Sequence, residues 1–256
     1  KVIKQIEQQF NKKAYIDILK FDKFVSAEEE HQDYALKNPQ AFLTETIESG
    51  RSTQINIKKG AKILFIGDSV TAYGRDYNEF ASIGKSYAKM LADEWQDNAT
   101  CYNTSVSGRK VKDVLDHFDE EVVRVNPDYA FVLIGVNDTW HGFPSANNPL
   151  PKFMEEYNLL INLIKEKTNA KIIVMEPFII GSVPEICIMK ADLNARIEII
   201  KKIVIENNLG YITFKKAFEN YLNKDNEQIY SHEGIHPTME GYKVMYEVIK
   251  NLVHFN

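Results

Sequence analysis

Three side chains in this sequence could together carry out nucleophilic catalysis: Ser69, Glu233 and His236. A serine hydroxyl is a weak nucleophile until a neighbouring base takes its proton, and histidine, with an unperturbed pKa of about 6.5, suits that role. A carboxylate that binds the imidazole would fix its tautomer and stabilise the imidazolium ion that forms. These residue types predict the chemistry of a serine esterase.

Ser69 follows a stretch that has the pattern of a buried strand. Residues 62–66 are mostly apolar and Gly67 closes the run, which is typical of a strand that ends in a tight turn. Open α/β sheets place their ligands at the carboxyl ends of their strands, where this serine would lie. In the alternative interpretation, Asp68 and Ser69 only cap the segment that follows.

Two further segments would bring hydrogen-bond donors to strand ends. Residues 103–108 follow a short strand-like run around Cys101, and residues 129–134 form a second buried-strand pattern that leads to Gly135 and Asn137. The oxyanion of a tetrahedral intermediate needs such donors, and the loss of one typically lowers turnover by about 10²–10³-fold.

Four blocks in order make the chain resemble the SGNH (GDSL-type) hydrolases over residues 57–256: Gly67-Asp68-Ser69, residues 103–108, residues 134–138 and residues 233–237. The resemblance implies that Ser69 is the nucleophile, that His236 is first the base and then the acid, and that Glu233 orients the imidazole. It implies an oxyanion hole made by the backbone N–H groups of Ser69 and Gly108 and the side-chain amide of Asn137. It also implies an α/β fold, a flavodoxin-like three-layer α/β/α sandwich with a five-stranded parallel sheet, and no cofactor or metal.

The chain departs from the family pattern at two positions. The orienting residue is usually an aspartate, whereas this chain has Glu233, and the extra methylene requires a slightly different backbone placement. The second block often carries a glycine where this chain has Ser105, which we expect to narrow the approach to Gly108. Neither change removes the nucleophile, the base or the amide.

Residues 232–236 also match the H-E-x-x-H pattern of zinc metalloproteases. That motif depends on a helix that places both histidines on one face. Gly234 weakens a helix, and Pro237 disfavours the helical conformation at His236. We therefore prefer the esterase interpretation to a zinc site.

The candidate substrate contacts are four side chains close to the expected nucleophile and amide: Asp68, Tyr73, Arg75 and Trp140. The sequences of residues 66–75 and 134–140 are similar to those of bacterial carbohydrate acetylesterases of the acetylxylan-esterase type. This likeness implies that a small acyl group, acetyl, is removed from a saccharide, on which Trp140 could stack. The alternatives are ordinary loop packing and, for Arg75, a surface ion pair with Asp76.

Two other functions are left open. The first is a lysophospholipase or thioesterase that acts on longer acyl chains. A long chain would require a broad apolar groove, whereas the polar residues expected near the acyl site suit a small acyl group better. The second is a non-catalytic binding module on the same fold, since a fold does not guarantee activity. The substituted carboxylate and the N-terminal extension motivate this second alternative.

Composition limits the partners. The 256 residues are 44% hydrophobic, enough for one large domain or a domain with an appendage. A formal net charge of -5 without a basic cluster argues against nucleic acid, and no apolar stretch approaches the roughly 20 residues of a membrane span. We expect a small-molecule or oligosaccharide ester as the partner, and we leave open a homo-oligomer.

The two cysteines, Cys101 and Cys187, form no spacing motif, so we expect free buried thiols. The chain begins at Lys1 without a signal-peptide pattern, and we expect a cytoplasmic protein, with a secreted form whose signal has been trimmed as the alternative.

Helical and strand-like patterns alternate through residues 54–256, which predicts right-handed βαβ units and a parallel sheet covered on both faces. Strands are also expected at residues 54–57, 172–175 and 211–214. The expected helix faces are Phe80, Ile83, Tyr87 and Leu91; Val111, Val114, Leu115, Phe118 and Val122; Phe153, Met154, Tyr157, Leu160, Ile161 and Ile164; Leu193, Ile197, Ile200 and Val204; and Met245, Val248, Ile249 and Leu252.

Residues 1–53 do not follow this alternation and are predicted to form a mostly helical N-terminal extension, with the SGNH hydrolase domain at 54–256. Val2, Ile6 and Phe10 suggest an amphipathic helix, and Glu28-Glu29-Glu30 with Asp33 suggests a solvated helix face. The extension is expected to pack on the domain or on a second subunit, and a lid over the substrate is the alternative.

Overall fold

The computed structural model describes residues 34–141, 148–181, 189–223 and 225–256. Its centre is a five-stranded parallel sheet with the order β3-β2-β4-β5-β6. This is the flavodoxin-like order, with the first strand of the sheet in second place, and it confirms the predicted fold. The strands are β2 (Ala61–Gly67), β3 (Ala99–Asn103), β4 (Tyr129–Leu133), β5 (Lys171–Met175) and β6 (Gly210–Ile212).

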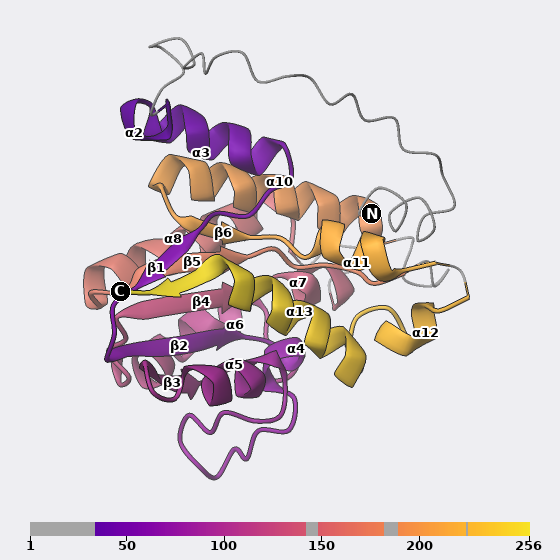
Figure 1. Cartoon of the computed structure of the whole chain (residues 1–256), viewed down its shortest axis with the longest axis horizontal. Helices are drawn as coiled ribbons and strands as arrows, with labels where there is room; N and C mark the ends of the chain where they lie inside the picture. The colour runs from indigo at the N-terminus through magenta and orange to yellow at the C-terminus, as the bar shows by residue number, and fades with distance from the viewer. Residues whose placement is uncertain (1–33, 142–147, 182–188, 224) are drawn as a thin grey trace, which may run out of the picture. The chain divides into compact units, whose positions relative to one another are not determined.

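Helices cover both faces of the sheet, as Figure 1 shows. Alternate residues of a strand point to opposite faces. Ile63 and Phe65 of β2 accordingly lie in the core under α5 and α13, while Leu64 and Ile66 lie in the core under α3, α6, α8 and α10. The bounds of these helices are α3 (Pro39–Glu48), α5 (Tyr87–Trp95), α6 (Val111–Asp116), α8 (Leu150–Lys167), α10 (Lys190–Asn207) and α13 (Met239–Leu252).

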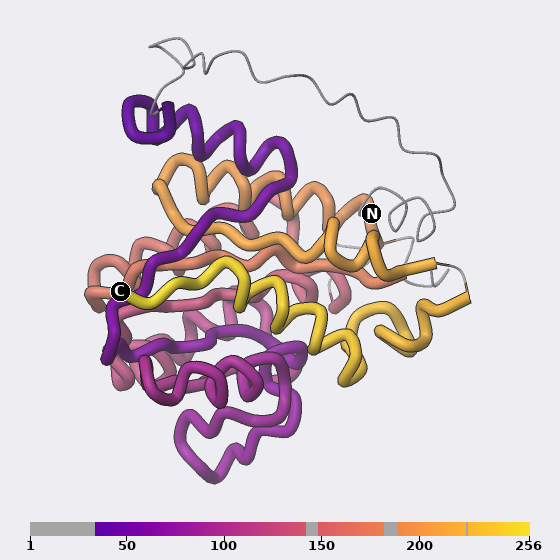
Figure 2. Tube along the Cα trace, in the orientation of Figure 1, coloured from indigo at the N-terminus to yellow at the C-terminus, as the bar shows by residue number. Residues whose placement is uncertain are grey.

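Shorter elements complete the domain, and most of them lie where the strands end. They are α4 (Ser69–Ala72), a π-helical turn at Asp119–Val123, α7 (Val136–Trp140), α11 (Lys215–Tyr221) and α12 (Glu227–Tyr230). Strand β1 (Ile55–Ile57) pairs in parallel with β7 (Val253–Phe255), so the segment that enters the sheet and the end of the chain run side by side (Figure 2).

Three predicted elements have different bounds. Phe80 and Ile83 precede α5, because Gly84 adopts a positive φ of 81° and Ser86 caps the helix at Tyr87. The pattern through Phe118 is divided between α6 and the π-helical turn, and β6 ends at Ile212 rather than at residue 214. The predicted helices at α8, α10 and α13 and the strands at β1 and β5 are confirmed.

The compact unit that contains the sheet is Pro39–Asn256. It includes α3, because Leu43 and Ile47 are buried in the core. Residues 39–53 therefore pack with the sheet, although the sequence analysis placed them in the extension. Helix α2 (Tyr34–Lys37) precedes this unit, and the amphipathic and acidic patterns predicted before it lie outside the described residues.

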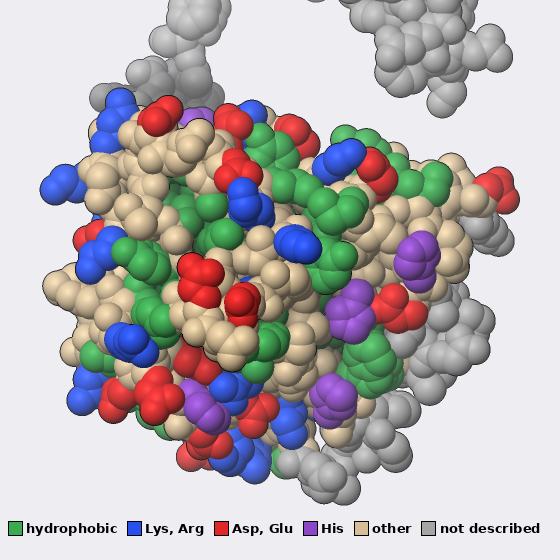
Figure 3. All heavy atoms as spheres, turned by 90° about the horizontal axis from the view of Figure 1, so that it is seen from below, with side chains coloured by type: hydrophobic (Ala, Val, Ile, Leu, Met, Phe, Trp, Pro, Cys, Tyr) green, Lys and Arg blue, Asp and Glu red, His purple; other side chains and the backbone are tan. Residues whose placement is uncertain are grey.

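The surface in Figure 3 mixes acidic, basic and apolar side chains without a large area of one sign. None of the helices in the described part of the chain is both long and apolar enough to cross a bilayer. Cys101 is a free, partly buried thiol, and burial raises its pKa to about 12; Cys187 lies outside the described residues.

Candidate active site

The expected nucleophile lies where β2 ends. Asp68 caps α4 by accepting a hydrogen bond from the Val70 N–H at 3.0 Å, and Ser69 is the first residue of that helix. A Cβ on Gly67 would lie 2.5 Å from the carbonyl oxygen of Leu133 on β4, so only glycine fits this turn. The capping interpretation of Asp68 is correct, and the cap also presents Ser69 at the edge of the sheet.

The imidazole of His236 reaches this serine. Ser69 Oγ lies 2.7 Å from His236 Nε2, and His236 Nδ1 contacts Glu233 Oε1. The same Glu233 oxygen accepts the backbone N–H of His236 at 2.7 Å. Because a carboxylate only accepts, Nδ1 carries the proton and Nε2 is free to accept the serine proton. The three predicted side chains therefore form a continuous relay.

The segment that carries the relay is a turn rather than a helix. Ser231, which the sequence analysis did not identify, accepts the Gly234 N–H at 2.8 Å and donates its hydroxyl to the His236 carbonyl at 2.9 Å. Gly234 has a positive φ of 92°. Residues 231–237 thus lack the helical geometry that the zinc motif needs. Among the described residues, no three His, Cys, Asp or Glu side chains are grouped to hold a metal.

Two of the three expected oxyanion donors, the Gly108 N–H and the Asn137 amide, come from two loops that contact each other. Asn137, on α7 after β4, is 3% exposed and donates one amide hydrogen to the carbonyl of Arg109 at 3.0 Å. Its second amide hydrogen stays available, since an amide nitrogen carries two. Gly108, directly before Arg109, is exposed and has a φ of 80°. These loops follow β3 and β4, which flank β2, so the residues lie at the switch point where such folds bind ligands.

Ser105 does not narrow the approach to Gly108. It is buried, its N–H donates to Asn103 Oδ1 at 3.0 Å, and its hydroxyl donates to the Phe65 carbonyl on β2 at 3.4 Å. The expectation was wrong because this side chain points toward the sheet.

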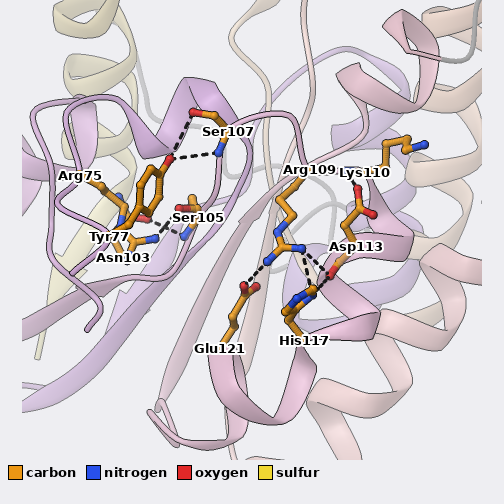
Figure 4. Close-up of polar contacts among 10 residues, drawn as sticks. All are labelled: Arg75, Tyr77, Asn103, Ser105, Ser107, Arg109, Lys110, Asp113, His117 and Glu121. Atoms are coloured by element: carbon orange, nitrogen blue, oxygen red, sulfur yellow. Dashed lines mark hydrogen bonds and ion pairs between the residues drawn. The ribbon is translucent and has the colours of Figure 1, made fainter. Parts of the chain in front are cut away.

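A small pocket of about 430 Å³ opens on Ser69 and His236. Of the predicted substrate contacts, Tyr73 and Arg75 line it, and Trp140 lies with its ring 5.8 Å from the His236 ring. Arg75 makes no ion pair with Asp76; its guanidinium donates to the carbonyl of Ser82 and, as Figure 4 shows, to that of Ser105. Asp68 is 1% exposed, and its side chain is used in the cap.

Two buried carboxyl groups lie beside the site. Burial raises the pKa of Asp68 to about 7 and that of Asp138 to about 7, and each backbone hydrogen bond opposes this rise. Asp138 accepts the Val111 N–H at 3.2 Å and the Asn148 amide at 2.6 Å, so it ties α7 to the start of α6. The sequence analysis did not identify Asp138, although it directly follows Asn137.

A fully buried arginine on α10 holds α7 in place through hydrogen bonds. Arg196 on α10 donates to Thr139 at 3.1 Å, to Asp192 at 2.8 Å and to the Asn148 carbonyl at 2.9 Å. The sequence analysis missed it as well; the available signal was a charged residue within the apolar face of a long helix.

Comparisons with known proteins agree with this geometry. An acetylxylan esterase of Geobacillus stearothermophilus is 27% identical over 207 residues, which cover 75% of this chain and 93% of the relative. Its crystal structure matches with a TM-score of 0.68 at 25% identity, over 76% of this chain and 94% of that one. A GDSL-like lipase family protein of Parabacteroides merdae matches with a TM-score of 0.71 at 26% identity, over 78% and 98%.

Two family models match parts of the sequence. A model of the peptide methionine sulfoxide reductase family matches residues 1–62, of which 1–33 lie outside the described part. The model of the GDSL-like lipase/acylhydrolase family matches residues 65–244, which include Ser69, Glu233 and His236 and the loops that carry Gly108 and Asn137. The chain belongs to the GDSL-like lipase/acylhydrolase family of carboxylic ester hydrolases.

Proposed function

We propose that this enzyme removes a small acyl group, acetyl, from an acylated carbohydrate, with Ser69 as nucleophile. The observation that carries the proposal is the relay from Glu233 through His236 to Ser69 Oγ, whose last step is 2.7 Å, at the mouth of a small pocket. Polar and aromatic side chains line this pocket, which suits a short acyl group better than the broad apolar groove that a long acyl chain would require. The likeness to acetylxylan esterase adds support for a saccharide.

The proposed reaction has two halves. In the first, His236 Nε2 takes the Ser69 proton while Oγ attacks the ester carbonyl carbon, and the oxyanion is stabilised by the N–H groups of Ser69 and Gly108 and the amide of Asn137. His236 then gives its proton to the departing sugar oxygen, which leaves an acyl-enzyme. In the second half, His236 takes a proton from water while the water oxygen adds to the acyl carbon. The bond from the acyl carbon to Ser69 Oγ then breaks, the carboxylic acid leaves, and His236 returns the proton to Oγ.

Aromatic side chains around the pocket support a sugar as the leaving group. Tyr73 is exposed, lines the pocket and is stacked on Tyr242, with the ring centroids 5.5 Å apart. The Trp140 ring also lies close to the imidazole, with the ring centroids 5.8 Å apart. Exposed aromatic faces next to polar groups suit the mixed apolar and hydroxylated surface of a saccharide ring.

The first experiment tests the nucleophile. Ser69→Ala should abolish hydrolysis of p-nitrophenyl acetate, apart from the residual rate of about 10³–10⁴-fold over water that binding and the oxyanion hole supply. Ser49→Ala, at the exposed turn directly after α3, is the matched control. A fluorophosphonate should label the wild type and not Ser69→Ala. Unchanged turnover in Ser69→Ala would refute the proposed role.

The second experiment tests the acyl group and the alcohol. The rates for acetyl, butyryl and octanoyl p-nitrophenyl esters should fall with chain length, and acetylated xylo-oligosaccharides should release acetate. A preference for octanoyl esters would instead favour the lysophospholipase or thioesterase alternative.

A further inference from the structure

The loop that carries Gly108 leaves the sheet just before this residue. Thr104 and Val106 donate their N–H groups to β2, to the carbonyls of Phe65 at 3.1 Å and Gly67 at 3.2 Å. The next residue, Ser107, has no such partner on β2. No described residue accepts a hydrogen bond from the Gly108 N–H, which is thus free to act as an oxyanion donor. Its direction must be set by contacts of its neighbours.

Tyr77 holds the residue on one side of Gly108. Its hydroxyl accepts the Ser107 N–H at 3.2 Å and donates to Ser107 Oγ at 3.3 Å, as Figure 4 shows. Tyr77 comes from the segment between α4 and α5, which closes on itself where the Lys85 N–H donates to the Tyr73 carbonyl at 2.7 Å.

Arg75 connects this segment to the Gly108 loop at a second point. Its Nη1 donates to the carbonyl of Ser105 and its Nε donates to that of Ser82 at 3.0 Å. The guanidinium carbon also lies 5.3 Å from the centroid of the Tyr77 ring, a cation–π distance. In the described part of the chain, both hydrogen bonds of the Arg75 guanidinium therefore go to backbone carbonyls of neighbouring loops.

The other side of Gly108 is held independently. The Arg109 carbonyl accepts a hydrogen bond from the Asn137 amide. The Arg109 guanidinium pairs with Glu121 at 2.6 Å (Figure 4), and both of these side chains are largely buried. Gly108 thus lies between two anchored neighbours.

We propose that Tyr77 and Arg75 are positioning residues of the oxyanion hole and not substrate contacts: they fix Ser105 and Ser107 so that the Gly108 N–H is preorganised toward the oxyanion. The charge on that oxygen exists only in the transition state, so the proposal concerns turnover rather than substrate binding. The proposal rests on the proposed ester hydrolysis with Ser69 as the nucleophile, and it does not depend on which ester is the natural substrate.

Tyr77→Phe is the sharpest variant, because it keeps the ring and its contact with Arg75 but removes the hydroxyl. For p-nitrophenyl acetate we expect kcat to fall about 10-fold, part of the loss caused by removing a whole donor, while KM changes by less than about twofold. Inhibition by phenylboronic acid, which forms a tetrahedral adduct with Ser69, should weaken by a similar factor. Tyr221→Phe, on the exposed face of α11, is the matched control.

Arg75→Lys separates positioning from charge. A lysine keeps the positive charge but cannot donate to two carbonyls in a fixed fork, so kcat should again fall with KM nearly unchanged. Thermal melting of each variant should stay close to that of the wild type. The proposal is overturned if KM rises while kcat is unchanged, which would mark a substrate contact, or if Tyr77→Phe leaves both kcat and boronate inhibition unaltered.

Discussion

The amide of Asn137 donates to the carbonyl of Arg109 at 3.0 Å, and this bond joins the loops that carry two of the proposed oxyanion donors, Gly108 and Asn137. Arg109 directly follows Gly108, so Asn137 can serve the oxyanion with one amide hydrogen and fix its partner donor with the other. We therefore expect Asn137→Ala to lower kcat toward the upper end of the range of about 10²–10³-fold for one lost donor.

The measurement is kcat for p-nitrophenyl acetate, with circular dichroism to verify folding. Asn158→Ala, on the exposed side of α8, is the matched control. A rate for Asn137→Ala within about threefold of the wild type would contradict the double role, because even a single lost donor should cost more.

Glu233 holds His236 at two atoms, the backbone N–H and Nδ1, through one carboxylate oxygen. In Glu233→Gln the amide can no longer stabilise the imidazolium ion, and its NH₂ group can favour the wrong tautomer. The corresponding change in a buried triad costs about 10⁴-fold, and we expect a smaller loss here, about 10²–10³-fold, because solvent reaches the pair.

Both side chains of that pair are more than 40% exposed, at 41% for Glu233 and 43% for His236, which is the reason for the smaller loss. Steady-state kinetics of Glu233→Gln beside Glu247→Gln, a surface control on α13, tests this. A near-wild-type rate would mean that the turn built around Ser231 orients the imidazole without the carboxylate.

Local patterns were sufficient to predict the strands and the relay. Residues 62–66 and 129–134 are apolar runs that end at glycines, and a serine or an amide placed just after such a run must lie at the carboxyl edge of a parallel sheet. The role of His236 could be predicted because Pro237 disfavours the helix that the H-E-x-x-H zinc motif would need at residues 232–236.

Contacts made to backbone carbonyls could not be predicted in the same way. Arg75 was expected to contact substrate, yet it donates to the carbonyls of Ser82 and Ser105. Every residue has a backbone carbonyl, so the residue types do not reveal which carbonyl accepts a hydrogen bond. The pairing of β1 with β7 likewise joins segments far apart in the sequence, and no periodicity encodes it. The start of α5 was misplaced because the apolar spacing runs on through Gly84, whose positive φ interrupts it.

Two glycines of the site should respond differently to alanine. A Cβ at Gly67 would lie 2.5 Å from the Leu133 carbonyl and 2.8 Å from Thr71 Oγ1, whereas a Cβ at Gly108 would meet nothing within 4 Å. Gly108→Ala should therefore cost only the strain of a positive φ, about 1–2 kcal/mol. Gly67→Ala must separate β2 from β4 and should destabilise the protein by more. Urea unfolding compares the two, and a Gly67→Ala variant as stable as Gly108→Ala would contradict the packing.

The buried carboxyl of Asp68 should make stability depend on pH. Burial raises its pKa to about 7, well above the ordinary value of about 3.9 that the unfolded chain would show. The folded state then binds the proton more tightly than the unfolded state. The contribution of protonated Asp68 to the free energy of unfolding is therefore fully present below about pH 4 and is lost as the pH rises through 7. Ionisation of this group at high pH should cost the folded state on the order of a few kcal/mol.

Asp68→Asn keeps an oxygen that can accept the Val70 N–H but cannot ionise, so it should escape that loss. The Tm of Asp68→Asn minus that of the wild type should therefore increase from pH 5 to pH 8, by about 2–4 °C for each kcal/mol. Asp138, whose pKa is also raised, remains in both proteins and largely cancels in the difference. Asp97→Asn, at an exposed turn, is the matched control. A difference in Tm that stays constant or decreases across this range would show that Asp68 is not held protonated by burial.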